Sequence, residues 1–317
     1  MLACLALIVA GCGDNVAPPP GQTLSPVRVA LFPSGATLPV YAAITKGIFE
    51  RNGPRIDVTE GMDLPVFMAA LTNGQYDVVM SVPTLALIGA EKHLDLQIVA
   101  GLQRQSQDRP NAVWITRDPS IESLAQLKGK TIAVPSLTGV IADALVYLLK
   151  RSGVERDDVK LVQTPFPTMG DQLETGHVDA AIATIPFYSA IAARGFRIHD
   201  DVIVDAVQDA SGGTLDTAIT SVWSASRKFA QENPQAIRAW RKSLTEATDF
   251  LDENESEARA LMETWLKIPT KVVDGAPLPD WAVEMTPQAL TPYITISKAV
   301  GTIRTDPDVN SLVWQGP

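Results

Sequence analysis

The sequence is poor in cysteine and histidine, the residue types that most often hold metal ions or act as nucleophiles. Its 317 residues contain two cysteines, Cys4 and Cys12, and three histidines. The chain after Cys12 therefore offers no disulfide framework, no cysteine-based zinc site and no catalytic thiol. His93, His177 and His199 lie in polar stretches, and we expect solvated surface side chains. We expect no cofactor and no metal ion.

Positive charge is also scarce. The chain has 26 Lys and Arg against 36 Asp and Glu, a formal net charge of −10 and a pI near 4.8. Binding to phosphate groups needs clustered Lys and Arg, and the densest basic group, Arg238, Arg241 and Lys242, lies in a stretch rich in acidic residues. We therefore expect no nucleic-acid partner. No later segment has the apolar length of a membrane-spanning helix either.

The first eleven residues are almost wholly apolar and end at Cys12. They are too short to span a bilayer, which takes about 20 residues, but they fit the apolar part of a secretory signal. Val9-Ala10-Gly11-Cys12 resembles the bacterial lipobox, in which the cysteine thiol carries a diacylglyceryl group. The resemblance implies a signal over residues 1–12, a lipid anchor at Cys12 and a Pro/Gly-rich tether over residues 13–23. Such signals normally open with Lys or Arg, and none precedes Cys12. Either the true start lies upstream, or the apolar run is unrelated to secretion.

A motif of the first half recurs 102 residues later. The matching residues are Leu71, Gly74 and Asp77 with Leu173, Gly176 and Asp179, and Pro33-Ser34 with Pro135-Ser136. Several matches in one register indicate two similar structural units.

Each unit has the pattern strand, helix, strand, helix, strand. The expected strands are 27–32, 55–59 and 77–81 in the first unit, and 131–134, 159–163 and 179–184 in the second. Strands that are apolar on both faces and alternate with helices are typical of parallel sheets covered by helices.

The remaining segments connect and complete these units. Residues 111–116 and 215–222 read as extended crossovers, and after Trp223 the pattern is helical, with a helix beginning at Pro234 behind Asn233. We predict a two-lobed α/β protein whose lobes each hold a mostly parallel sheet and are joined by two hinge crossovers. Lobe 1 is predicted to comprise residues 24–112 and 217–317, and lobe 2 residues 113–216.

In open parallel sheets, ligands bind beyond the carboxyl ends of the strands. The loops expected there are rich in hydroxyl groups and helix-start N–H groups, which suit a carboxylate, a sulfonate or another polar oxygen. The polar candidates are Ser34, Gly35, Thr37, Ser81, Thr84, Ser136, Thr138, Gly139 and Thr184, and the apolar ones are Tyr41, Met62, Phe67, Phe187 and Tyr188. The hydroxyl groups could equally cap helices, and Tyr41 and Phe67 could equally belong to the core.

Two charged residues bear on the ligand class. Arg104 follows a strand and is a candidate anion clamp, with a solvated arginine as the alternative. Asp216, at the start of the return crossover, is a candidate partner for an amine. Since neither sign of charge is concentrated in the loops, we expect a weakly charged or mixed ligand.

Segments 38–50, 71–79, 98–102, 124–135 and 179–182 resemble the NMT1/SsuA/THI5-like branch of periplasmic solute-binding proteins. The similarity extends over about residues 24–312. It implies a type II periplasmic binding protein fold, a small-molecule ligand held between two closing lobes, and delivery to the membrane permease of an ABC importer. It also implies a location outside the cytoplasmic membrane and no catalysis, and we expect a monomer. Relatives take sulfonates, nitrate, bicarbonate and pyrimidine or thiamine precursors, so the resemblance does not identify the substrate.

Two other functions stay open. A binding protein of this kind can serve sensing or ligand handover, which a neighbouring sensor kinase gene would favour over a permease and ATPase gene pair. An enzyme on the same architecture, such as a porphobilinogen deaminase-like protein, needs a cysteine for its cofactor, and the chain has none after Cys12. The Gly-x-Ser-x-Gly pattern of a nucleophilic serine is absent too.

Overall fold

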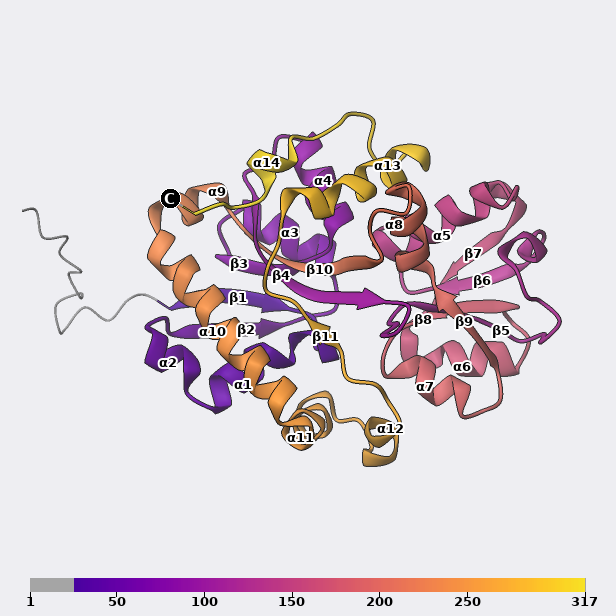
Figure 1. The fold of residues 1–317 in the computed structure, drawn as a ribbon, viewed down its shortest axis with the longest axis horizontal. Helices are drawn as coiled ribbons and strands as arrows, with labels where there is room; N and C mark the ends of the chain where they lie inside the picture. Colours follow the sequence, from indigo (N-terminus) through magenta and orange to yellow (C-terminus); the bar gives the residue numbers. More distant parts are fainter. Residues whose placement is uncertain (1–25, 317) are drawn as a thin grey trace, which may run out of the picture.

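The computed structural model describes residues 26–316, which form two β-sheets lying side by side (Figure 1). The first sheet has the order β11-β4-β10-β3-β1-β2, with strands β1 (Val27–Leu31), β2 (Ile56–Glu60), β3 (Val78–Ser81), β4 (Gln97–Ser106), β10 (Thr217–Ala225) and β11 (Asp280–Trp281). The second has the order β7-β6-β8-β5-β9, with strands β5 (Val113–Thr116), β6 (Thr131–Val134), β7 (Lys160–Gln163), β8 (Ala180–Ala183) and β9 (Arg197–Asp201). We call the halves built on these sheets lobe 1 and lobe 2.

Both sheets contain the same parallel core. Strands β2-β1-β3 in lobe 1 and β7-β6-β8 in lobe 2 have the same order and direction, as expected of a repeated unit. The other strands are antiparallel to their neighbours, so each sheet is mixed rather than mostly parallel. They include the crossover strands β5 and β10, which lead from one lobe to the other. Strands β9 and β11 were not predicted, because one is largely charged and the other has two residues.

The repeated motif has the same conformation in both lobes. Gly74 and Gly176 follow helices α3 (Leu64–Thr72) and α6 (Phe166–Glu174) with φ of +71° and +74°, a region that favours glycine over residues with a side chain. Asp77 and Asp179 each accept a hydrogen bond from a backbone N–H of the adjacent parallel strand, at 2.8 and 3.0 Å. The motif therefore ends one helix and fixes the start of the third strand.

The Pro-Ser turns are less alike than their matching letters suggest. Val29 pairs with Val78 in lobe 1, and Ile132 pairs with Ala180 in lobe 2. The third strands of the two units are 102 residues apart, like the motif, but the first strands are one residue further apart than that. The turn at Pro33 therefore begins one residue later along its strand than the turn at Pro135.

Helices cover both faces of the two sheets. The α-helices are α1 (Leu38–Thr45), α2 (Ile48–Asn52), α3 (Leu64–Thr72), α4 (Pro83–Glu91), α5 (Val140–Arg151), α6 (Phe166–Glu174), α7 (Phe187–Ala192), α8 (Val202–Ala210), α9 (Arg227–Glu232), α10 (Pro234–Glu253), α11 (Glu255–Leu266), α12 (Thr270–Asp274), α13 (Thr291–Ala299) and α14 (Val309–Leu312). Single 3-10 turns are η1 (Gly35–Thr37), η2 (Leu124–Leu127), η3 (Arg156–Asp158) and η4 (Pro287–Leu290).

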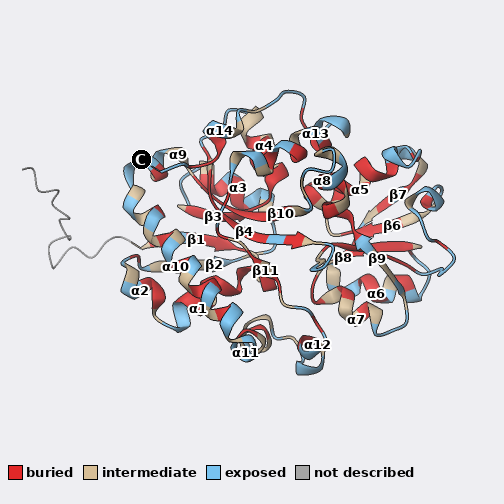
Figure 2. Cartoon of the chain, viewed as in Figure 1, coloured by how far each residue is buried: buried red, intermediate tan, exposed pale blue. Residues whose placement is uncertain are grey.

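The buried residues form two clusters, one along each face of the pair of sheets (Figure 2). One cluster contains side chains of α3, α4, α5, α8 and α13, and the other contains side chains of α1, α2, α6, α7 and α10. Each cluster runs through both lobes, so the lobes share apolar packing beside their crossovers.

The helical C-terminal third does not pack on lobe 1 alone. Helices α10 and α11 contact α1, whereas α13 contacts α8 and α5, which cover lobe 2. Asp143 of α5 accepts hydrogen bonds from Ser297 Oγ at 3.0 Å and Thr302 Oγ1 at 2.8 Å. The C-terminal segment therefore bridges the lobes, while the predicted lobe boundaries stay a prediction.

The long helix α10 begins at Pro234, which confirms the predicted start. Asn233 occupies the N-cap position, but its side chain donates to Phe229 O at 3.2 Å instead of capping α10. The predicted signal, the lipid anchor at Cys12 and the tether lie outside the described residues. Within residues 26–316, no helix is both long enough and apolar enough to cross a membrane.

Candidate functional site

The carboxyl ends of the parallel strands face each other across the two lobes. Strand β4 runs in the same direction as β3 and leads through residues 107–112 into β5 (Figure 1). Strand β5 then begins beside the carboxyl end of β8, where Val113 pairs with Ala183. The loops that follow the parallel strands of lobe 1 and lobe 2 therefore open toward a common region, as the binding-site prediction requires.

The first lobe 1 loop, residues 32–37, contains two hydroxyl groups. One forms hydrogen bonds within the loop, and the other has no partner among the described residues. Thr37 Oγ1 lies 3.1 Å from Phe32 O and 3.0 Å from Ser34 O, and it accepts the Ser34 N–H. Ser34 Oγ is buried and has no hydrogen-bond partner among the described residues. The same holds for Thr84 Oγ1 at the start of α4. Buried hydroxyl groups are normally paired, so these two remain candidates for contact with a ligand.

Gly35 is packed against the C-terminal segment, and its carbonyl group is already hydrogen-bonded. A Cβ atom at this position would lie 2.9 Å from Cγ of Pro279, and the indole N–H of Trp281 donates to Gly35 O at 2.9 Å. The segment between α11 and β11 thus covers this loop closely. Ser81 is fully buried, and its hydroxyl group makes one long contact of 3.4 Å with Val82 O.

The facing loops of lobe 2 also carry hydroxyl groups. Ser136 Oγ accepts the Thr138 N–H at 3.3 Å, while the Thr138 side chain is exposed. Gly139 begins α5 with φ of +103°, which explains the glycine there. Thr184 is half-buried, and its carbonyl group accepts the Tyr188 N–H at 3.1 Å.

The predicted aromatic wall is only partly exposed. Phe67 is 5% exposed and belongs to the core beneath α3, and Tyr188 is 9% exposed. Tyr188 donates its hydroxyl group to Pro110 O at 3.2 Å, and burial raises its pKa to about 12. Met62 is 77% exposed. Phe187 is half-buried and stacks on Phe166 from the neighbouring loop, with ring centroids 5.6 Å apart.

Arg104 is exposed, but it is not a free anion clamp. Its guanidinium group binds the carboxylate of Asp280 through two hydrogen bonds of 2.9 and 3.3 Å, and Arg109 lies 3.5 Å from the same carboxylate. This pairing was missed because β11, which carries Asp280 alongside β4, was not predicted. Asp216 is exposed next to the start of β10.

The first crossover is held by a buried carboxylate that the sequence did not single out. Asp201 is fully buried and accepts the backbone N–H groups of Asn111, Ala112, Ile203 and Val204 as well as the amide of Gln105, at 2.6 to 3.1 Å. Burial raises its pKa to about 6, and the four backbone donors oppose that rise. Asp201 thus ties the end of β4 and the start of the first crossover to the start of α8.

A second missed residue is Glu60, the last residue of β2. Its Oε1 atom accepts hydrogen bonds from the Tyr41 hydroxyl group and, at 3.0 Å, from Trp265 Nε1. The rings of Tyr41 and Trp265 lie against each other with centroids 3.4 Å apart. The predicted strand ended at residue 59, whereas β2 ends at Glu60. Glu60 therefore fell between the predicted strand and the predicted loop, and it was not counted among the candidate residues.

The expectation for the histidines was wrong for His199. Its ring stacks on Trp114 with centroids 3.6 Å apart and forms a hydrogen bond of 3.1 Å with Thr116 Oγ1. Burial lowers its pKa, so the ring packs as a neutral group. His93 and His177 are exposed. Within the described part of the chain, no group of three or more His, Cys, Asp or Glu residues is arranged to hold a metal ion.

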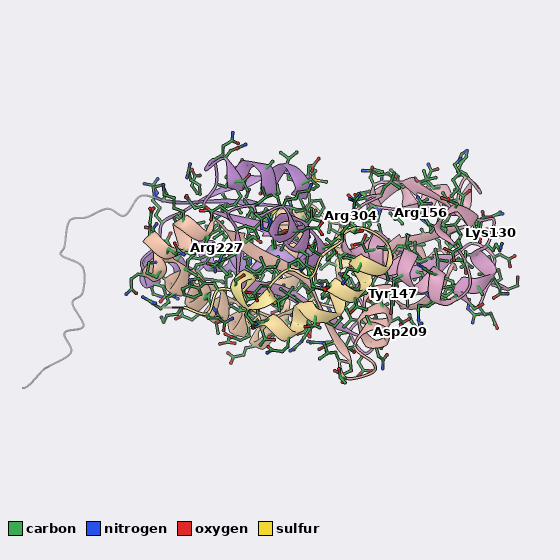
Figure 3. The ribbon with its side chains drawn as sticks, turned by 90° about the horizontal axis from the view of Figure 1, so that it is seen from above. Lys130, Tyr147, Arg156, Asp209, Arg227 and Arg304 are labelled. Carbon is green, nitrogen blue, oxygen red and sulfur yellow. The ribbon has the colours of Figure 1, made fainter. Side chains whose placement is uncertain are left out.

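A surface hollow of about 740 Å³ lies elsewhere, over α5 and α8, and contains none of the predicted site residues. One pair of its charged groups is already engaged: Asp209 accepts the Tyr147 hydroxyl group at 2.5 Å and lies 3.1 Å from Arg151 Nε. Figure 3 shows Tyr147 of α5 and Asp209 of α8 close together. We therefore place the candidate site at the facing loops.

Comparison with known proteins finds related sequences and structures. A Brucella abortus protein whose name describes it as a putative binding protein is 26% identical over 77% of this chain and 72% of its own length. The taurine-binding periplasmic protein of Escherichia coli is 26% identical over 57% of this chain and 56% of its own. The crystal structure of the periplasmic aliphatic sulphonate binding protein SsuA from Escherichia coli superposes with a TM-score of 0.74, at 18% identity, over 92% of this chain and 94% of that one.

The last similarity shows the fold, which is that of the periplasmic binding proteins. Most of the related sequences are named as binding proteins, among them a putative ABC transporter periplasmic binding protein of Brachyspira hyodysenteriae. The NMT1/THI5-like family model matches residues 35–258, more than half of the chain. The chain belongs to the NMT1/THI5-like family.

Proposed function

We propose that this protein is the extracytoplasmic solute-binding lipoprotein of an ABC importer. It captures one small organic molecule between lobe 1 and lobe 2, closes about its two crossovers, and delivers the molecule to a membrane permease as a monomer without catalysing a reaction. Closure follows from differential affinity, because a ligand that contacts both lobes binds the closed form more tightly.

One observation carries this proposal. Ser34 Oγ and Thr84 Oγ1 are buried donors without a hydrogen-bond partner among residues 26–316, and both lie on lobe 1 at the edge that faces the loops of lobe 2. Unpaired buried hydroxyl groups cost free energy, and a polar ligand would remove that cost. The N-terminus of α4 on this edge and the N-terminus of α5 on the facing edge of lobe 2 add N–H groups that suit a polar oxygen.

Hydrogen exchange tests the proposal. Binding of a small-molecule extract from the host should slow amide exchange in both loops 32–37 and 135–139, because a bridging ligand contacts both lobes. Loop 117–123, on the far side of lobe 2, is the internal control and should not change. Protection of only one of the two loops would rule out bridging.

The lipid anchor has its own test. In a bacterial host fed with labelled palmitate, the full chain should become labelled, and Cys12→Ala should abolish the label because it removes the only thiol at the lipobox position. Cys4→Ala is the matched control and should retain the label. Loss of label in both variants, or in neither, would contradict attachment at Cys12.

A further inference from the structure

The cluster of Glu60, Tyr41 and Trp265 places a carboxylate at the carboxyl end of β2, on the edge of lobe 1 that faces lobe 2. Glu60 is exposed, and only its Oε1 atom is engaged, by the Tyr41 hydroxyl group and by Trp265 Nε1 at 3.0 Å. Its Oε2 atom makes no hydrogen bond within residues 26–316. One oxygen thus holds the side chain in place while the other remains available.

The charge state of this cluster is well defined. Hydrogen bonds from Tyr41 and Trp265 lower the pKa of Glu60, so the carboxylate is ionised at neutral pH. Burial and the adjacent carboxylate raise the pKa of Tyr41, so its hydroxyl group stays protonated and remains the donor. Two aromatic side chains packed against each other therefore hold a fixed negative charge.

Little positive charge is available near it. The six loops at the carboxyl ends (residues 32–37, 61–63, 81–84, 135–139, 164–168 and 184–188) contain no Lys, Arg or His. Their one charged residue, Asp63, accepts the Val66 N–H as the cap of α3. Arg104 is committed to Asp280. Lys267 lowers the pKa of Glu60 through its charge, but the two form no ion pair within 4.0 Å.

The facing edge of lobe 2 is uncharged and aromatic. Phe166 and Phe187 are the first residues of α6 and α7, which follow β7 and β8, and their rings are stacked with an interplanar angle of 12°. Both side chains are half-buried. Aromatic groups on both edges, together with one carboxylate on the lobe 1 edge, suit a flat apolar ligand that bears positive charge.

We propose that the ligand is an organic cation, a protonated amine attached to an aromatic group. Its ammonium group binds Glu60 Oε2 in a charge-assisted hydrogen bond beside the Tyr41 and Trp265 rings, and its aromatic part reaches Phe166 and Phe187. This inference rests on the proposed capture of a solute between the lobes, and it names Glu60 as the residue that selects for charge.

Three probes that differ only in the polar group test it: 2-phenylethylamine, 2-phenylethanol and 2-phenylethanesulfonate, titrated calorimetrically into the full chain. The amine should bind at least about tenfold more tightly than the alcohol, and the sulfonate more weakly than both, because Glu60 attracts one charge and repels the other. Glu60→Gln should weaken amine binding about tenfold and change alcohol binding by less than about twofold. Asp57→Asn is the matched control, an exposed carboxylate earlier on the same strand, and should bind like the wild type.

Mass spectrometry of any small molecule that co-purifies with the native protein gives a second readout. A co-purified amine supports the inference even if none of the three probes binds. Preference for the sulfonate, an anionic or neutral co-purified molecule, or unchanged amine binding by the Gln variant would overturn it and leave solute capture intact. Failure of every probe and absence of any co-purified molecule would overturn the proposed function and this inference together.

Discussion

Asp143 should make the stability of the protein depend on pH in a direction opposite to that of most salt-bridged carboxylates. It lies on α5 at the contact with the C-terminal segment and is 6% exposed. Its two hydrogen-bond donors are the neutral hydroxyl groups of Ser297 and Thr302, and none of the described basic groups forms an ion pair with it. Burial raises its pKa from 3.8 to about 6.

The sign and size of the effect follow from this shift. Because the folded protein binds the proton more tightly than the unfolded chain does, the contribution of Asp143 to the free energy of unfolding is largest in acid and falls as the pH rises from about 4 to 6. A shift of this size corresponds to about 3 kcal/mol at pH 8. Asp143→Asn carries no charge, and its amide can still bond both hydroxyl groups, since each can donate or accept. It should therefore raise the free energy of unfolding by about 1–3 kcal/mol at pH 8 and by little at pH 4.5.

Urea unfolding at both pH values, followed by tryptophan fluorescence, measures the change. Asp306→Asn is the control: this carboxylate is exposed and pairs with Lys298 at 2.7 Å, so its loss should cost at most about 1 kcal/mol at pH 8. Equal destabilisation of Asp143→Asn at both pH values would refute the reasoning, because the hydroxyl groups would then be holding the ionised form.

The remaining predictions concern the crossovers and two glycines. Asp201→Asn should lower the free energy of unfolding by at least about 2 kcal/mol at pH 8 in the same urea assay, since an amide nitrogen cannot accept the N–H groups that Asp201 binds; a stabilised variant would contradict the hydrogen-bond network. Gly139→Ala should cost about 1–2 kcal/mol because of its φ of +103°, and a neutral result would mean that the turn relaxes freely. Gly35→Ala should displace Pro279, which its Cβ would approach to 2.9 Å, and so speed limited proteolysis in residues 267–279; an unchanged cleavage rate would show that the covering segment adapts.

The repeated unit was predictable because its signals are local. The strands, the glycines that end α3 and α6, and Asp77 and Asp179 all follow from hydrophobic pattern and turn chemistry within short windows. The rule that ligands bind at the carboxyl ends of strands then located the facing loops without any knowledge of tertiary contacts.

The state of individual side chains was not predictable, because it depends on partners far along the chain. Arg104 is bound by Asp280, 176 residues away, and Trp265 reaches Glu60 across 205 residues. Both partners come from the C-terminal segment, whose weak pattern gave no sign that it folds over the site. The burial of His199 was not predicted for the same reason, because its ring meets the Trp114 ring only when β5 pairs with β9.

Closure of the two lobes on a ligand is the central claim, and a distance between them tests it most directly. Spin labels at Met62→Cys and Leu137→Cys would sit on opposite edges, at side chains that are 77% and 50% exposed, with Cys4 and Cys12 replaced by serine. Electron paramagnetic resonance should show this distance shortening into a single narrower distribution when a small-molecule extract from the host is added. A distribution that stays unchanged while calorimetry shows binding would contradict the account.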